Sequence, residues 1–311
     1  MSNIIKTVIK IGTRGSALAM VQANWVKERL NKKYPDSQVE LIVIKTKGDI
    51  MQDVALVKIG GKGVFVKEIE DALLRGDIDL AVHSMKDVPA VLPDALEIAV
   101  TPEREDPRDV LVARGNLKFE RLPHGARIGT GSLRRQCQLH HLYKDVNILT
   151  MRGNLDTRIR KIETENLHGI IVAAAGMRRM GWIDRISHFI PPELMIPAVG
   201  QGVLALEVRK DDMALKGTLA FLNHERTWRE VSAERAFLKR LGGGCQLPIA
   251  AYAELKGETL FINGLLGTID GLAIIRNEFR GPVQEGEELG VRLAEDLLAR
   301  GGQAIMDMLN Y

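Results

Sequence analysis

Two segments of the chain share one short pattern, in which an apolar strand breaks at Gly-Thr and leads through Gly-Ser into a helix. The first copy places a strand at residues 8–11 and a helix at 17–33. The second places a strand at 126–128 and a helix at 133–143. Serine is a good helix N-cap, and the apolar side chains that follow it recur at helical spacing. Such a repeat is what two related lobes would show, although a match this short also arises by chance.

Strands continue to alternate with helices around these two copies. Further strands are expected at residues 41–45, 78–82, 146–150 and 169–174, with a helix at 64–75 that Gly76 ends. Alternation of this kind predicts an α/β fold with a largely parallel sheet, whose functional loops lie at the carboxyl ends of the strands. The glycine-rich residues 60–63 lack the ending of a phosphate-binding loop and indicate a flexible lid.

The C-terminal part of the chain changes character. Three strands are expected at residues 250–255, 259–266 and 273–280, with turn-forming Lys-Gly and Asp-Gly pairs between them, followed by a helix at 287–300. This order predicts a small α+β domain with a three-stranded antiparallel sheet.

Composition excludes several classes of function. The 311 residues are 45% hydrophobic and 27% charged with a net charge of +3, so no strong positive field marks a nucleic-acid binder, and aromatic residues are too few for a base-stacking surface. No apolar run reaches the roughly 18 residues that a membrane span needs. The N-terminus does not read as a signal peptide, and two cysteines give no disulfide framework. We therefore expect a cytoplasmic protein without nucleic-acid or membrane partners.

Cys245 lies in an unusual loop, Leu-Gly-Gly-Gly-Cys-Gln-Leu-Pro. Three glycines allow backbone angles that other residues resist, and Pro248 prevents a regular helix from continuing. A thiol on such a loop fits a covalent attachment point, a nucleophile or an ordinary loop residue. The loop alone favours the ordinary interpretation.

Arginines recur where the expected strands end or the expected helices begin. Helix N-termini favour anions, and the guanidinium group of an arginine can bind a carboxylate or phosphate through two parallel hydrogen bonds. Any single arginine is more often a solvated surface charge, which is our interpretation of Arg160 and Arg178. The recurrence predicts a polyanionic small-molecule ligand, bound by several of Arg14, Arg134, Arg135, Arg152, Arg158 and Arg179.

Asp87 follows the strand expected at 78–82, within His-Ser-Met-Lys-Asp. A carboxylate there can cap a turn, or it can face a ligand and stabilise positive charge. If the segment is extended, Ser84 and Lys86 point to the opposite side from Asp87. His83 fits a core or supporting role better than metal ligation, because no partner ligands stand at metal spacing.

These segments together resemble the porphobilinogen deaminase (hydroxymethylbilane synthase) family over nearly the whole chain. The resemblance is carried by six ordered motifs at residues 12–16, 81–89, 129–135, 151–154, 197–202 and 243–248. Two departures are visible. The family commonly has an acidic residue at Gly242, whose replacement is expected to loosen the cysteine loop. The family commonly has a serine at the position of Gly131, and the absence of that serine removes one hydroxyl contact to a substrate carboxylate.

The resemblance implies two periplasmic-binding-protein-like lobes around a cleft, plus the small C-terminal domain. Domain 1 would comprise residues 1–102 and 199–220, domain 2 residues 103–198, and domain 3 residues 221–311, which carry the cofactor cysteine. The family also suggests a monomer.

The implied activity is the condensation of four porphobilinogen molecules with loss of ammonia, giving hydroxymethylbilane. Cys245 would carry a dipyrromethane cofactor through a thioether, and Asp87 would be catalytic and contact the pyrrole N–H groups. Further cofactor contacts would come from Lys86, Ser84, Thr130, Ser132, Arg134 and Arg135. Substrate contacts would come from Arg14, Ser16, Arg152, Arg158 and Arg179. The resemblance implies no metal.

Two other functions deserve comparison. A two-lobed anion-binding protein would explain the repeated lobes and the arginines, but it would leave Cys245, Asp87 and the third domain without a purpose. A thiol-dependent acyl transferase would use Cys245, but no histidine lies near that residue in the sequence to act as its base.

Overall fold

The structure is a computed structural model that describes residues 8–50, 66–242 and 247–309. It contains two compact units, one formed by Met1–Arg104 with Val203–Trp228 and the other by Glu105–Gly202 with Arg229–Tyr311. The expected lid at 60–63 and the expected attachment residue, Cys245, lie outside the described residues. The three expected domain boundaries stay a prediction.

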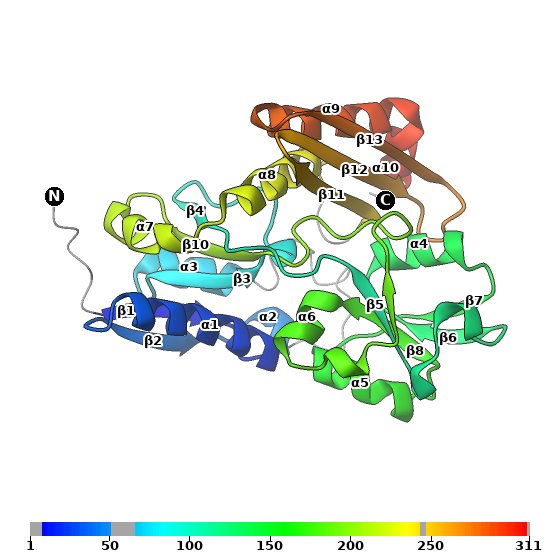
Figure 1. Ribbon diagram of the computed structural model, residues 1–311, viewed down its shortest axis with the longest axis horizontal. Helices are drawn as coiled ribbons and strands as arrows, with labels where there is room; N and C mark the ends of the chain where they lie inside the picture. The colour runs from blue at the N-terminus through cyan, green and yellow to red at the C-terminus, as the bar shows by residue number, and fades with distance from the viewer. Residues whose placement is uncertain (1–7, 51–65, 243–246, 310–311) are drawn as a thin grey trace. The chain divides into compact units, whose positions relative to one another are not determined.

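The first unit is built on a five-stranded sheet in the order β2-β1-β3-β10-β4. Its strands are β1 (Val8–Thr13), β2 (Gln38–Val43), β3 (Leu80–Ser84), β4 (Leu96–Val100) and β10 (Leu204–Arg209). Figure 1 shows that β10, which comes late in the chain, lies beside the early strands β3 and β4. The sheet is therefore completed by a segment that returns from the second unit.

Helices cover both faces of this sheet. They are α1 (Ala17–Lys33), α2 (Lys47–Ile50), α3 (Lys67–Arg75) and α7 (Met213–Leu219). One core cluster joins α1 and α7 to the sheet through Val26, Leu30 and Leu215. A second cluster joins α3 to the sheet through Ile69 and Leu73. The apolar spacing that predicts α1 and α3 is thus the spacing that each helix buries.

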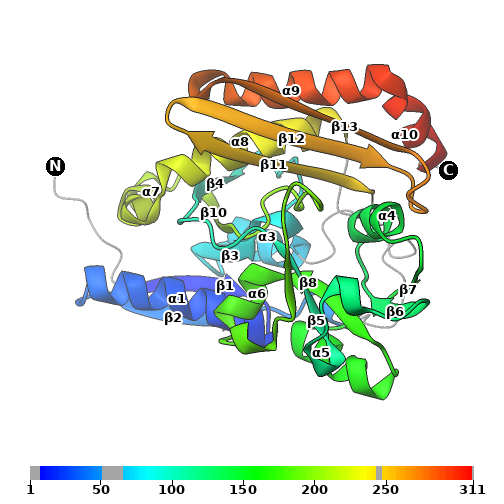
Figure 2. The same cartoon turned by 45° about the vertical axis from the view of Figure 1, so that its right-hand side comes forward.

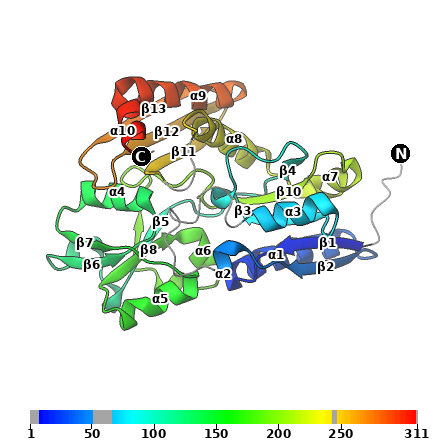
Figure 3. The same ribbon diagram turned by 180° about the vertical axis from the view of Figure 1, so that it is seen from behind.

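The second unit begins with another five-stranded sheet, in the order β7-β6-β8-β5-β9. Its strands are β5 (Asp109–Ala113), β6 (Ala126–Gly129), β7 (Val146–Leu149), β8 (Gly169–Ala173) and β9 (His188–Ile190). The helices that cover it are α4 (Leu133–Leu142), α5 (Leu155–Thr164) and α6 (Ala174–Arg179). Figure 3 shows α4 and α5 on opposite sides of this sheet, each with its own apolar cluster.

The two five-stranded sheets have equivalent topologies. In each, the second strand pairs in parallel with both neighbours, whereas the fourth strand runs antiparallel to both of its neighbours. This equivalence confirms the two related α/β lobes. The expectation of a largely parallel sheet is confirmed, because four of the five strands in each sheet run in one direction and only β10 or β5 is reversed.

The three-stranded antiparallel sheet in the C-terminal part is also confirmed, as β11 (Ile249–Lys256), β12 (Thr259–Gly267) and β13 (Ile274–Pro282). It packs with α8 (Glu225–Arg240), α9 (Gly286–Leu297) and α10 (Gln303–Leu309) around the buried Phe237. Figure 2 shows α9 lying along this sheet. The expected helix 287–300 corresponds to α9 up to Leu297, where a π-helical segment, Leu298–Gly302, continues the chain and includes Gly301 with a φ of 104°.

Candidate functional site

The turn after β1 carries Arg14 and Ser16, two of the expected substrate contacts. Ser16 caps α1, since its hydroxyl oxygen accepts a hydrogen bond from the Ala19 amide (3.3 Å). Arg14 precedes this cap and is half-buried. The helix N-terminus and the arginine therefore place two positive groups at one strand end.

The end of β3 carries Ser84, Lys86 and Asp87. Met85–Asp87 form one turn of 3-10 helix, so the expected alternation of an extended segment was wrong here. Ser84 exchanges hydrogen bonds with the buried Gln22 side chain at 3.0 and 3.3 Å, and the Met85 amide donates to the Val203 carbonyl (2.9 Å). These contacts fix the strand end, while Asp87 itself is exposed.

His83 is buried, and its Nε2 atom lies 2.9 Å from Oε2 of Glu207 on β10. The expected core or supporting role agrees with this contact. The sequence did not indicate a role for Glu207. It is the one carboxylate in an otherwise apolar part of β10, and its partner, His83, lies far away in the sequence.

The turn after β6 holds Thr130 and Ser132, and Ser132 caps its helix as Ser16 does in the first lobe. Ser132 caps α4 by accepting a hydrogen bond from the Arg135 amide (3.4 Å), and its own amide donates to Thr130 Oγ1 (3.3 Å). The backbone at Gly131, between these two residues, lies close to that of Met151, so a Cβ at residue 131 would collide with the Met151 carbonyl oxygen. With this backbone, residue 131 has no room for the serine side chain that was expected there.

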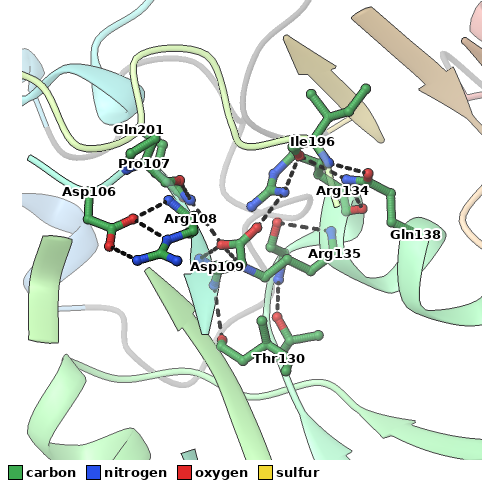
Figure 4. Close-up of polar contacts among 12 residues, drawn as sticks. Asp106, Pro107, Arg108, Asp109, Thr130, Arg134, Arg135, Gln138, Ile196 and Gln201 are labelled. Atoms are coloured by element: carbon green, nitrogen blue, oxygen red, sulfur yellow. Dashed lines mark hydrogen bonds and ion pairs between the residues drawn. The ribbon is translucent and has the colours of Figure 1, made fainter. Parts of the chain in front are cut away.

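Arg134 and Arg135 begin α4 and are both buried around the fully buried Asp109 (Figure 4). Arg135 Nε donates to Asp109 Oδ1 (2.9 Å), and Arg134 Nη1 lies 2.7 Å from Oδ2. The two guanidinium groups hold the pKa of Asp109 well below its usual range despite its burial. Sequence reasoning missed Asp109, because its partners lie 25 and 26 residues away on another element.

The remaining candidate arginines of the second unit differ in their surroundings. Arg158 donates from Nε to the Gly153 carbonyl (2.7 Å), and Arg152 is half-buried. Arg179 donates from Nη2 to the Gly202 carbonyl (2.7 Å). Burial lowers the pKa of Arg179 to about 10, so the group stays cationic at neutral pH in a setting that disfavours charge. A carboxylate ligand would relieve that cost.

Arg178, interpreted from the sequence as a surface charge, faces carboxylates instead. Its Nε lies 3.4 Å from Asp106 Oδ2 and 3.7 Å from Glu105 Oε1. Arg178 therefore faces two carboxylates of its unit, and the charge of Glu105 also acts on Arg179.

Three successive residues of the segment that returns to the first unit are held by side chains from three elements. Glu234 of α8 accepts from the Gly200 amide (2.7 Å), Gln201 donates to Asp109 (3.0 Å), and Arg179 of α6 donates to Gly202. Gln201 is fully buried and was not singled out as a site residue from the sequence.

Gly242 marks the last described position before the cysteine loop. It lies in the turn that follows α8 and has a φ of +63°, a left-handed conformation that glycine adopts without the steric cost of a side chain. The expected loosening of the loop by this glycine stays a prediction. The other cysteine, Cys137, is fully buried, and burial raises its pKa to about 12, which agrees with a packing role.

Within the described ranges, no group of three or more His, Cys, Asp or Glu side chains is arranged to hold a metal ion. No helix in the same ranges is long and apolar enough to span a membrane.

Solved structures with a likeness to this chain include two periplasmic proteins. The aliphatic sulphonate binding protein SsuA from Escherichia coli is 17% identical with a TM-score of 0.39, covering 75% of this chain and 70% of that one. An arginine-specific binding protein from Salmonella typhimurium is 15% identical with a TM-score of 0.40, covering 71% and 93%. The equivalent strand orders of the two sheets, rather than these scores, establish the fold described above.

Sequence comparison identifies the family. Residues 9–217 match the family description "Porphobilinogen deaminase, dipyromethane cofactor binding domain", and residues 228–299 match "Porphobilinogen deaminase, C-terminal domain". A porphobilinogen deaminase of Syntrophus aciditrophicus is 57% identical over 97% of this chain and 98% of its own length. One of Geobacter metallireducens is 52% identical over 96% and 93%. The chain therefore belongs to the porphobilinogen deaminase family.

Proposed function

We propose that the chain performs the reaction of its family, in which four porphobilinogen molecules join head to tail to give hydroxymethylbilane in tetrapyrrole biosynthesis. Each addition breaks the C–N bond of the departing ammonia, forms a C–C bond and removes a proton from the attacked pyrrole carbon, and one water molecule supplies the hydroxyl group of the product when it is released. The match to both family domains over nearly the whole chain carries this proposal. The enzyme is a transferase that polymerises a pyrrole.

The described residues fit a ligand rich in carboxylates. Each pyrrole of the substrate and of the dipyrromethane cofactor bears an acetate and a propionate. Around Asp109, one carboxylate stands between two buried guanidinium groups, and the buried Nε of Arg134 has no hydrogen-bond partner among the described residues. A buried donor without an acceptor is costly, so an anionic group at this place is favoured.

We assign cofactor contacts to Ser84, Lys86, Asp87, Thr130, Ser132, Arg134 and Arg135, and substrate contacts to Arg14, Ser16, Arg152, Arg158 and Arg179. When bound, the dipyrromethane supplies the free pyrrole carbon that accepts the first substrate. Cys245 would bind it covalently, and the neighbouring glycines would give that thiol its reach.

Asp87 would stabilise the positive charge of the reaction. Loss of ammonia from porphobilinogen leaves a cation that is shared with the pyrrole nitrogen. An ionised carboxylate that accepts the pyrrole N–H hydrogen bond favours this charge where it develops. The fixed end of β3, held by Gln22 and Val203, would keep Asp87 in place for each of the four additions.

Intact-mass measurement after incubation with porphobilinogen tests the proposal. We expect the protein to be heavier than its sequence by two linked pyrrole units, and to release ammonia as it consumes substrate. Cys245→Ala should fold but lack the added mass, whereas Cys137→Ala serves as the matched control and should keep it. A wild-type protein that keeps its bare sequence mass and binds anions reversibly would favour the two-lobed binding protein instead.

We further propose that the enzyme is a cytoplasmic monomer that does not bind nucleic acid. The modest net charge and the two cysteines support this view. Cell fractionation and sedimentation of the purified protein would test the location and the oligomeric state.

A further inference from the structure

Asp109, the first residue of β5, is a fully buried carboxylate whose two oxygens are both engaged by cationic side chains (Figure 4). Oδ1 accepts from Arg135 Nε at 2.9 Å and from Gln201 Nε2 at 3.0 Å, and Arg135 Nη2 lies 2.8 Å away. Oδ2 lies 2.7 Å from Arg134 Nη1. Two successive arginines therefore share one carboxylate.

The two guanidinium groups also donate hydrogen bonds to backbone carbonyls. Arg135 Nη1 donates to the Ile171 carbonyl (3.0 Å), and Arg134 Nη1 donates to the Ile196 carbonyl (2.7 Å). Both side chains are more than nine-tenths buried. Their planes are consequently fixed before any ligand arrives, which lowers the entropic cost of binding.

The charges within this cluster do not balance. One carboxylate between two guanidinium groups leaves one positive charge, and burial together with Arg134 lowers the pKa of Arg135 even though Asp109 opposes that shift. The two arginines differ, since every side-chain nitrogen of Arg135 has a hydrogen-bond or ion-pair partner, while the buried Nε of Arg134 lacks a hydrogen-bond partner among the described residues. The unsatisfied donor lies on Arg134.

We propose that Asp109 is a positioning residue that holds Arg134 and Arg135 as a fixed pair with one uncompensated positive charge, so that the pair receives a single carboxylate group, for which Arg134 Nε is the open donor. This proposal rests on the function proposed above, because the carboxylate would belong to the dipyrromethane. Asp109 does not itself contact the ligand. It acts through the two arginines, and Gln201 orients it from the returning segment.

The test compares Asp109→Asn and Asp109→Glu with the matched control Asp106→Asn. Asp106 lies three residues away and pairs with Arg108 (2.7 Å) and Arg178 (3.4 Å) instead. Apo-protein of each variant is incubated with a series of porphobilinogen concentrations, and covalent loading is followed by intact mass. Urea denaturation of each variant reports on folding independently.

We expect folded Asp109→Asn to need at least tenfold more porphobilinogen for half-maximal loading, because its arginines are no longer held together. Asp109→Glu should need at least threefold more, since its carboxylate is displaced by one methylene, and Asp106→Asn should match the wild type. A merely structural role would reduce the fraction of protein that loads without changing this concentration dependence.

Several outcomes would overturn the proposal. If Asp109→Asn folds and loads with the concentration dependence of the wild type, Asp109 does not have the proposed positioning role. If Asp109→Asn does not fold, wild-type loading by folded Asp109→Glu has the same consequence. If neither the wild type nor Asp106→Asn gains any mass, the function proposed above is wrong, and this inference is wrong with it.

Discussion

His83 and Glu207 form a buried contact across two antiparallel strands, with Nε2 and Oε2 2.9 Å apart. Glu70 of α3 is a second buried carboxylate close to this pair. Burial, and then the charge of Glu207, raises the pKa of Glu70 to about 7, although His83 opposes the shift. The cluster beneath α3 therefore holds a proton on Glu70 in mildly acidic solution.

This cluster predicts a pH-dependent stability that Glu70→Gln removes. Between about pH 4.5 and 7 the folded protein keeps the proton of Glu70 and the unfolded chain does not, so this contribution is present at low pH and lost as the pH rises through 7. His83, Glu207 and Asp71 are the charged groups that act on Glu70. Relative to Glu70→Gln, the wild-type free energy of unfolding should fall by about 3 kcal/mol over this range.

Urea denaturation from pH 4.5 to 8 measures the effect. Glu97→Gln on β4, which removes a carboxylate paired with Lys216, is the control and should keep the wild-type pH dependence. Identical slopes for the wild type and Glu70→Gln would contradict the prediction.

Asp87→Ala should reduce kcat by two to three powers of ten, which corresponds to about 3–4 kcal/mol of lost stabilisation of the developing cation. Asp87→Glu should keep part of the activity, since it retains a carboxylate. Asp94→Ala, an exposed change in the loop before β4, is the control for the charge change. Steady-state product formation gives all three values, and near-native turnover by Asp87→Ala would refute the catalytic assignment.

Arg179→Gln should raise the KM for porphobilinogen roughly ten- to a hundredfold, the effect of losing a charge-assisted hydrogen bond of about 1.5–3 kcal/mol. The adjacent Arg178→Gln should change KM less than about threefold, because Arg178 already faces Asp106 and Glu105. The two variants remove the same charge from neighbouring positions. Equal KM values for both would show that the position of the charge does not matter.

Gly131→Ala should lower the free energy of unfolding by about 1–3 kcal/mol, because its Cβ meets the backbone oxygen of Met151, which cannot move aside as a side chain can. Gly15→Ala, at the corresponding turn of the first lobe, is the control. Its Cβ would meet only the Val43 side chain at 3.2 Å. Comparable urea midpoints for the two variants would contradict this account.

Local features of the fold were readable from the sequence. Helix α1 was predicted with its observed bounds, and Ser16 and Ser132 cap the helices as expected, because capping and helical spacing depend on near neighbours. Strands β5 and β10 were missed. Their partners lie far along the chain, so no local pattern shows that they complete the two sheets.

In the candidate site, too, local features could be predicted from the sequence and long-range contacts could not. The segments that carry Asp87, Thr130 and the arginines could be recognised as motifs, but the sequence could not show which of them are compensated. Asp109, Gln201 and Glu207 engage side chains more than 20 residues away. The contacts of Arg134, Arg178 and Arg179 with Asp109, Asp106 and Gly202 are of the same long-range kind.

The position of β10 between β3 and β4 also bears on how the chain matures during synthesis. Residues 204–209 leave the ribosome about 100 residues after β4, which at typical rates of translation takes on the order of 5–20 s. Until then, β3 and β4 have no strand between them, and their facing edges carry unpaired amide and carbonyl groups. The second lobe holds its own five strands by residue 190. It can therefore fold first, and the nascent first lobe is the part of this enzyme most exposed to misassembly.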